Sequence, residues 1–229
     1  YDHFMLKEIY EQPNAIIDTY RGRLLAKKGI IKMSGIEDNL EKFTNANRII
    51  VIACGTSWHA GLVSEYIFEE FARIPVEVEY ASEFRYRNPI IYENDVVIAI
   101  SQSGETADTP SASHLMKQSG YDQLSIVNAK NTELDRITNN SIYMRANKEI
   151  GVASTKTFMS TLQILFTIAL YLAQNSNSKL INNKLFDDYK NIPIEYTISD
   201  SQIRSYSEHI TRRTNIIDNI YFRLFQKMV

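Results

Sequence analysis

The chain of 229 residues carries 25 Lys and Arg against 27 Asp and Glu, and its length suits one substantial domain with a large core. The formal net charge of -2 argues against nucleic acid as a main partner, because no basic excess is present to neutralise a phosphate backbone. The single cysteine, Cys54, excludes an internal disulfide framework and a cysteine-based zinc cluster, and it favours a reducing compartment.

Residues 1–46 are predicted to form a helical lead-in to the main domain. Between residues 2 and 22 the apolar positions fit two short amphipathic helices, the second beginning at Pro13. The chain starts at Tyr1 rather than methionine, and it shows neither a signal segment nor an apolar run of the about 20 residues that span a bilayer. We therefore expect a cytoplasmic protein that makes no membrane contact, and a chain cut from a longer polypeptide.

Residues 48–53 form the first predicted strand of the main domain, and hydroxyl side chains follow it. The strand is a β-branched apolar run, which is typical of a buried parallel strand, and Thr56 and Ser57 come directly after it. Cys54 is either a nucleophile at a helix start or a small residue packed where the strand ends. The helix expected at residues 58–72 carries His59, which is either a ligand contact or an ordinary helix histidine. The aromatic residues of that helix are assigned to the core.

A second apolar strand, residues 96–100, empties into Ser-Gln-Ser-Gly-Glu-Thr at residues 101–106. Hydroxyl groups donate hydrogen bonds to phosphate oxygens, Gly104 lets the backbone come close, and the amides of the next helix add donors and a positive dipole end. The same pattern also fits an ordinary turn with an N-cap. Glu105 is assigned as a carboxylate at a helix N-terminus rather than a base beside phosphate, since like charges repel.

The remaining elements alternate strand and helix. We expect strands at residues 76–80, 123–127 and 141–144, and helices at residues 82–86, 105–118, 133–137 and 155–174. This alternation predicts an α/β fold, a three-layer αβα sandwich around a five-stranded, parallel, doubly wound sheet of the flavodoxin-like type. The hydroxyl loops at residues 54–57 and 101–106 would then meet in the crevice at the switch point of the sheet.

Residues 149–156, Glu-Ile-Gly-Val-Ala-Ser-Thr-Lys, precede the long apolar helix, and Ser154 or Thr155 is expected to be its N-cap. Pro110 is compatible with the helix at residues 105–118 only in its first turn. His3, His114 and His209 have no metal-ligand spacing and are assigned to the surface. No metal site and no cofactor are expected.

Three motifs carry a resemblance to a known family: residues 54–57, 101–109 and 149–156. They resemble those of sugar isomerase (SIS) domains, and in particular the isomerase half of the glucosamine-6-phosphate synthases, also called glutamine–fructose-6-phosphate aminotransferases. Residues 4–13 and 81–87 are similar to the same family, so the resemblance covers the chain from Tyr1 to about residue 173.

The resemblance implies that residues 47–175 are a first SIS domain and that residues 176–229 are a tail leading towards a second one. That second domain, the glutaminase domain and the groups that catalyse proton transfer are expected to be missing from this chain, so no catalytic residue is assigned. The implied ligand is fructose 6-phosphate or glucosamine 6-phosphate, and the implied assembly is a homodimer. The phosphate is assigned to Ser57, Ser101, Gln102, Ser103 and Thr106, and the sugar to Thr56, Val152 and Ser154.

Two other functions stay open at this point: a stand-alone module that senses a phosphosugar, and an inactive, truncated relic of the synthase. A sensor is expected to carry a DNA-binding or ligand-sensing appendage, which neither the near-neutral charge nor residues 175–229 suggest. A short helix is predicted at residues 201–209.

Overall fold

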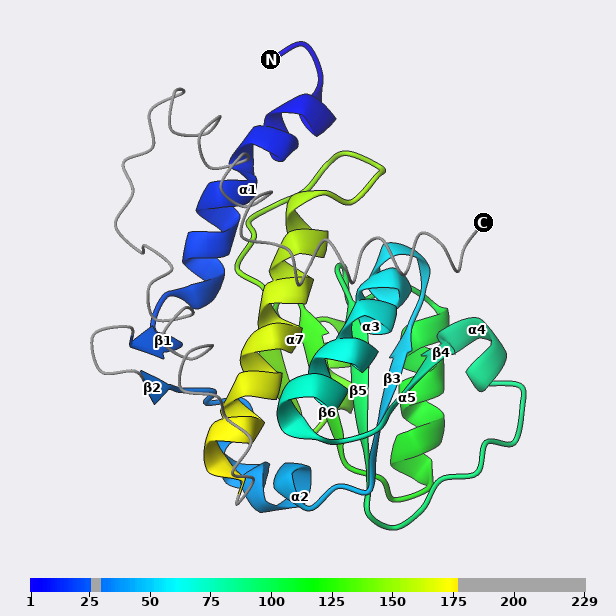
Figure 1. Ribbon diagram of the computed structural model, residues 1–229. Helices are drawn as coiled ribbons and strands as arrows, with labels where there is room; N and C mark the ends of the chain where they lie inside the picture. Colours follow the sequence, from blue (N-terminus) through cyan, green and yellow to red (C-terminus); the bar gives the residue numbers. More distant parts are fainter. Residues whose placement is uncertain (26–29, 177–229) are drawn as a thin grey trace.

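Five parallel strands form the central sheet of the computed structural model, which describes residues 1–25 and 30–176 (Figure 1). The strand order is β4-β3-β5-β6-β7, so the chain reverses its direction of winding between β3 and β5. This confirms the predicted doubly wound, flavodoxin-like sheet. The strands are β3 (Arg48–Ala53), β4 (Val76–Tyr80), β5 (Asp95–Ser101), β6 (Gln123–Val127) and β7 (Asn140–Tyr143).

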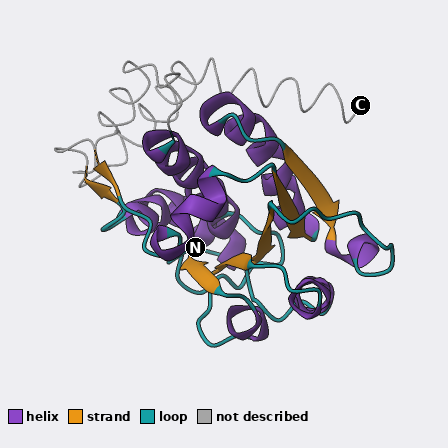
Figure 2. Ribbon diagram, turned by 90° about the horizontal axis from the view of Figure 1, so that it is seen from below, coloured by secondary structure: helices purple, strands orange, loops and turns teal. Residues whose placement is uncertain are grey.

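Helices cover both faces of this sheet, as Figure 2 shows. On β3, Ile49 and Val51 pack in one core cluster, whereas Ile50 and Ile52 pack in the cluster on the other face. This two-sided burial explains why the strand reads as an unbroken apolar run. The first face carries α3 (Gly55–Ile67), continued by a π-helical turn η3 (Phe68–Ala72), together with α7 (Lys156–Asn175) and α2 (Leu40–Thr44); the second carries α4 (Ala81–Phe84), α5 (Asp108–Gln118) and α6 (Glu133–Ile137).

Helix α7 is long and apolar enough to cross a membrane by length and composition alone. In the fold, however, 72% of its most apolar window is buried, and it packs between α1 (Phe4–Tyr20) and α3 (Figure 1). It is therefore the core helix that its sequence predicts.

The amino-terminal segment differs from the prediction of two helices, because α1 is one continuous helix with Pro13 inside it. Proline removes only the hydrogen bond that its own N–H would make to the carbonyl of Ile9. The long packing contact between α1 and α7 holds the helix together on both sides of that gap. A small antiparallel ribbon, β1 (Leu24–Leu25) with β2 (Ile30–Ile31), and a 3-10 turn, η2 (Glu37–Asn39), follow α1.

Several element boundaries shift by a few residues from the prediction. Helix α5 begins at Asp108 rather than near Glu105, and Pro110 lies in its first turn, where proline is tolerated. Helix α3 begins at Gly55, before Trp58. The predicted tail and the helix at residues 201–209 lie outside the described residues.

Candidate functional site

The two predicted hydroxyl loops leave the sheet side by side. Ala53 at the end of β3 pairs with Ile100 near the end of β5, so the residues that follow both strands emerge at the switch point. Thr56 is exposed and Ser57 is half-buried in the first turn of α3, where the N–H groups of a helix have no intrahelical acceptor. The structure thus brings this turn and the loop from residue 102 to residue 107 to one place.

Three hydroxyl groups converge in the loop after β5. Ser101 Oγ accepts a hydrogen bond from Gly104 N at 3.0 Å, and Ser103 Oγ accepts one from Glu105 N at 3.2 Å. Thr106 Oγ1 lies 3.3 Å from both serine Oγ atoms. A hydroxyl that accepts a backbone hydrogen bond keeps its own proton for donation, so this cluster can offer several donors to one anion.

Gly104 fixes the shape of this loop against α6. Its φ is +68°, and a Cβ added there would lie 2.2 Å from Thr132 Oγ1. The Gly104 carbonyl accepts a hydrogen bond from Leu134 N at 3.1 Å. The Glu105 carboxylate accepts one from Glu133 N at 2.9 Å. Glu105 is therefore a helix N-terminal carboxylate as predicted, but it serves α6 rather than α5.

Asn128, immediately after β6, connects the loop after β5 to the segment after β7. Its backbone N–H donates to the carbonyl of Gln102 at 3.1 Å. Its side chain accepts from Ala146 N at 3.0 Å and donates to the carbonyl of Asn147 at 2.7 Å. The sequence analysis missed Asn128; its place directly after a buried strand at the carboxyl edge of the sheet was the available signal.

Thr155 lies at the N-cap position of α7 as predicted, but the side chain that caps the helix is that of Glu149. The Thr155 side chain caps no N–H group of the helix. Glu149 Oε1 instead accepts from Thr155 N at 3.0 Å and from Thr157 N at 3.3 Å, and the Thr157 hydroxyl donates to Glu149 Oε2. A carboxylate is a better cap than a hydroxyl here, because it has two acceptor oxygens and a full negative charge at the positive end of the helix dipole. Ser154 Oγ lies 2.7 Å from Oγ1 of Thr157 in the first turn of α7.

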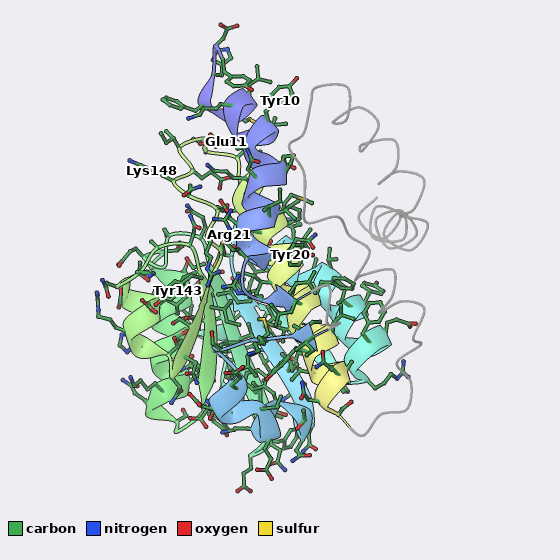
Figure 3. The ribbon with its side chains drawn as sticks, turned by 90° about the vertical axis from the view of Figure 1, so that its left-hand side faces the viewer. Tyr10, Glu11, Tyr20, Arg21, Tyr143 and Lys148 are labelled. Carbon is green, nitrogen blue, oxygen red and sulfur yellow. The ribbon has the colours of Figure 1, made fainter. Side chains whose placement is uncertain are left out.

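Helix α1 contributes two further carboxylates that the sequence analysis missed. Glu8 is 2% exposed and accepts hydrogen bonds from Ile150 N at 2.5 Å and Gly151 N at 3.1 Å. Glu11 accepts from Nζ of the buried Lys156 at 2.7 Å, and this hydrogen bond lowers the pKa of the Glu11 carboxyl. In Figure 3 the segment that carries Lys148 lies beside the part of α1 that carries Glu11. The signal in the sequence was a carboxylate, Glu8, on the same helical face as the buried Ala15.

The other predicted residues have ordinary surroundings. The side chain of Val152 is fully exposed, and the sugar contact that the resemblance implies there is made by its carbonyl. His59 is exposed on α3 with Nδ1 2.9 Å from the Gly55 carbonyl oxygen.

Cys54 is partly buried against the second core cluster, in agreement with the packing interpretation. His3 and His114 are exposed, whereas His209 lies outside the described residues.

An open depression of about 380 Å³ lies at the opposite, amino-terminal end of the strands. Its lining includes the carboxylates of Asp38 and Glu41, which would repel a phosphate, and one lysine, Lys42, which is already paired with Asp122. The hydroxyl cluster at the carboxyl edge therefore remains the better anion site. Within residues 1–25 and 30–176, no group of three or more His, Cys, Asp or Glu side chains is placed to hold a metal ion.

Comparison with known proteins gives a consistent result. The family model described as SIS domain matches residues 42–171. A glutamine–fructose-6-phosphate aminotransferase [isomerizing] from Chlorobaculum tepidum is 52% identical over 174 residues, which is 76% of this chain and 28% of the relative. The enzyme of the same name from Bacteroides thetaiotaomicron is 52% identical over 178 residues, which is 78% of this chain and 29% of the relative.

Among solved structures, the C-terminal domain of glucosamine-fructose-6-phosphate aminotransferase from Francisella tularensis superposes with a TM-score of 0.75 at 37% identity. The match covers 83% of this chain and 52% of that one. The chain thus spans less than a third of the length of the two curated relatives described above.

Proposed function

The chain belongs to the SIS domain family, and from that premise we propose that it binds a hexose 6-phosphate at the carboxyl edge of its sheet. One observation carries the proposal: the hydroxyl groups of Ser101, Ser103 and Thr106 converge beside the backbone amides of a glycine-containing loop. Such a cluster suits a phosphate, because hydroxyl and amide donors bind its oxygens without requiring a lysine.

In this proposal the ligand phosphate lies on the loop after β5, with Gln102 and the first turn of α3 at Ser57 alongside. Thr56, the carbonyl of Val152 and the hydroxyl of Ser154 orient the sugar. Ser101 is 4% exposed, and its hydroxyl accepts from Gly104 N while its own proton is left for the phosphate; Thr106 is exposed and meets the ligand directly.

The relatives support a more specific proposal about the intact protein. We propose that residues 47–175 act as the first SIS domain of a glutamine–fructose-6-phosphate aminotransferase, which makes glucosamine 6-phosphate from fructose 6-phosphate and glutamine-derived ammonia. The described residues would supply the ligand seat, and proton transfer between sugar carbons is not assigned to any of them. We further propose a cytoplasmic homodimer.

Calorimetric titration of the chain tests the ligand assignment. Glucosamine 6-phosphate and fructose 6-phosphate should bind, and unphosphorylated glucosamine should not, because the phosphate provides the charge that the hydroxyl cluster recognises. Heat from glucosamine equal to that from its phosphate would contradict the proposal. Turnover of fructose 6-phosphate and ammonia by this chain alone would show that the seat carries catalytic groups as well.

The double variant Ser101→Ala/Ser103→Ala tests the placement of the phosphate. Each lost hydrogen bond to a charged group costs about 1.5–3 kcal/mol, so phosphosugar affinity should fall by roughly 100-fold or more. Ser111→Ala is the matched control, since that hydroxyl donates to the carbonyl of Ala107, the N-cap residue of its own helix α5. An unchanged affinity in the double variant would mean that the phosphate binds elsewhere.

A further inference from the structure

Residues 149–155 form a loop that we call the sugar-facing loop, because the proposed function places Val152 and Ser154 against the sugar. Two carboxylates hold this loop, and neither belongs to the residues assigned to the sugar. Its apolar side chains do not anchor it, because Ile150 is 50% exposed and Val152 is fully exposed. At the end of the loop that leads into α7, the Glu149 carboxylate accepts hydrogen bonds from the backbone N–H groups of Thr155 and Thr157. Glu8 of α1 ties the other end through the two backbone N–H groups of Ile150 and Gly151.

The contact between Glu8 and the loop is close and buried. The Glu8 side chain is among the few charged groups of the described residues that are almost wholly inaccessible, at 2% exposure. A Cβ added to Gly151 would lie 2.6 Å from Glu8 Oε2 and 3.4 Å from the Cα of Met5. The backbone of the loop therefore rests directly on α1, and a glycine allows that approach.

The loop of residues 102–107 after β5, which we call the phosphate loop, is held by groups other than those that hold the sugar-facing loop. Thr132 lies against Gly104, and the backbone N–H groups of Leu134 and Asn128 donate to the carbonyls of Gly104 and Gln102. The Asn128 side chain also bonds residues 146 and 147, but none of these hydrogen bonds involves α1 or residues 150–154. A disturbance at Glu8 is thus expected to move the sugar-facing loop while leaving the hydroxyl cluster in place. This separation makes the two parts of the seat distinguishable by experiment.

We propose that Glu8 is a positioning residue: its carboxylate holds the Ile150–Gly151 backbone on α1 and so presents the Val152 carbonyl and the Ser154 hydroxyl to the sugar. This inference rests on the proposed function. It makes the position of α1 a determinant of affinity for the sugar part of the ligand, and not for its phosphate. Glu8 needs no contact with the ligand for this role, because it acts through the loop backbone.

The test compares two ligands on the full chain, glucosamine 6-phosphate and inorganic phosphate, by calorimetry. Glu8→Gln replaces one acceptor oxygen by an NH₂ donor that faces a backbone N–H, so affinity for glucosamine 6-phosphate should fall by about tenfold. Affinity for inorganic phosphate should change by less than about twofold, as for independent sites. Asp18→Asn is the matched control on α1, since Asp18 pairs with Arg21 and not with the loop; it should leave both affinities unchanged.

A second variant reaches the same contact from the loop. Gly151→Ala places a methyl group against Glu8 Oε2 without altering α1, and it should produce the same selective loss. This variant also tests the proposal if the Glu8→Gln protein does not fold. If the wild type binds neither ligand, the proposed function falls and this inference falls with it. If the wild type binds but both variants keep its affinity for glucosamine 6-phosphate, or lose both ligands equally, Glu8 does not position the sugar-facing loop.

Discussion

Gly104→Ala is the substitution for which the structure makes the sharpest prediction. Gly104 has a φ of +68°, and an alanine Cβ would lie 2.2 Å from Oγ1 and 2.6 Å from Cβ of Thr132. Thr132 cannot move freely, because its hydroxyl caps α6 by accepting from Asp135 N. We therefore expect the variant to be less stable and the hydroxyl loop to be displaced.

Two effects lower the stability of this variant, the left-handed backbone and the overpacking against Thr132, and a substitution at a second glycine distinguishes them. The left-handed backbone costs about 1–2 kcal/mol for a residue with a Cβ. Overpacking against Thr132 costs about 1–3 kcal/mol more. Gly120 has a φ of +82° but no atom within 4 Å of an added Cβ, so Gly120→Ala carries the backbone cost alone. Gly104→Ala should lose about 2–5 kcal/mol of unfolding free energy and Gly120→Ala about 1–2.

Denaturant unfolding followed by circular dichroism measures the two losses, and calorimetry with glucosamine 6-phosphate measures the effect on binding. The affinity of Gly104→Ala should fall, whereas that of Gly120→Ala should match the wild type, because Gly120 lies in the turn after α5, away from the loop. Equal stability losses in the two variants would refute the packing argument. Wild-type binding by Gly104→Ala would refute the argument that this glycine shapes the ligand seat.

Three further predictions concern other contacts. Glu149→Ala should lower the free energy of unfolding by about 1–2 kcal/mol in denaturant titration, because α7 loses its cap. Asp95→Asn should cost about 1.5–3 kcal/mol in the same assay, since Arg48 would lose its charge-assisted hydrogen bond to the wholly buried carboxylate at 2.5 Å but would keep its pair with Glu77. The hydrogen bond from Lys156 lowers the pKa of Glu11 below its ordinary value of 4.5, so its contribution to stability is complete above that value and is lost as the pH falls through the lowered pKa. The stability difference between the wild type and Glu11→Gln, measured by denaturant unfolding at several pH values, should therefore shrink on acidification.

Each of these predictions has an outcome that would contradict it. Wild-type stability of the Glu149 variant would mean that other groups cap α7. For Asp95, a loss no larger than that of Asp18→Asn, whose ion-pair partner Arg21 is exposed, would show that burial of the pair is unimportant. A pH-independent difference between the wild type and Glu11→Gln would show that ionisation of Glu11 is not linked to folding.

Much of the fold was predictable because it depends on local pattern. The apolar run at residues 48–53 and the run at residues 96–100 are buried on both faces, so their composition alone distinguishes them as central parallel strands. The positions of the hydroxyl residues were predictable too, because in both loops these residues come directly after the end of a strand. Even so, the helix starts at Gly55 and Asp108 were misplaced by a few residues, because helix boundaries respond to contacts with neighbouring elements as well as to propensity.

The sequence by itself determined the layered α/β architecture, the adjacent hydroxyl loops and the family, since each is written in short, contiguous stretches. Only the tertiary structure decided what holds those loops. Glu8 meets Gly151 across 143 positions of the chain, and Asn128 meets Asn147 across 19. Pro13 likewise fails to break α1, because packing against α7 outweighs the one hydrogen bond that proline removes. Contacts between distant segments depend on how the elements pack, and no local pattern of residues records that packing.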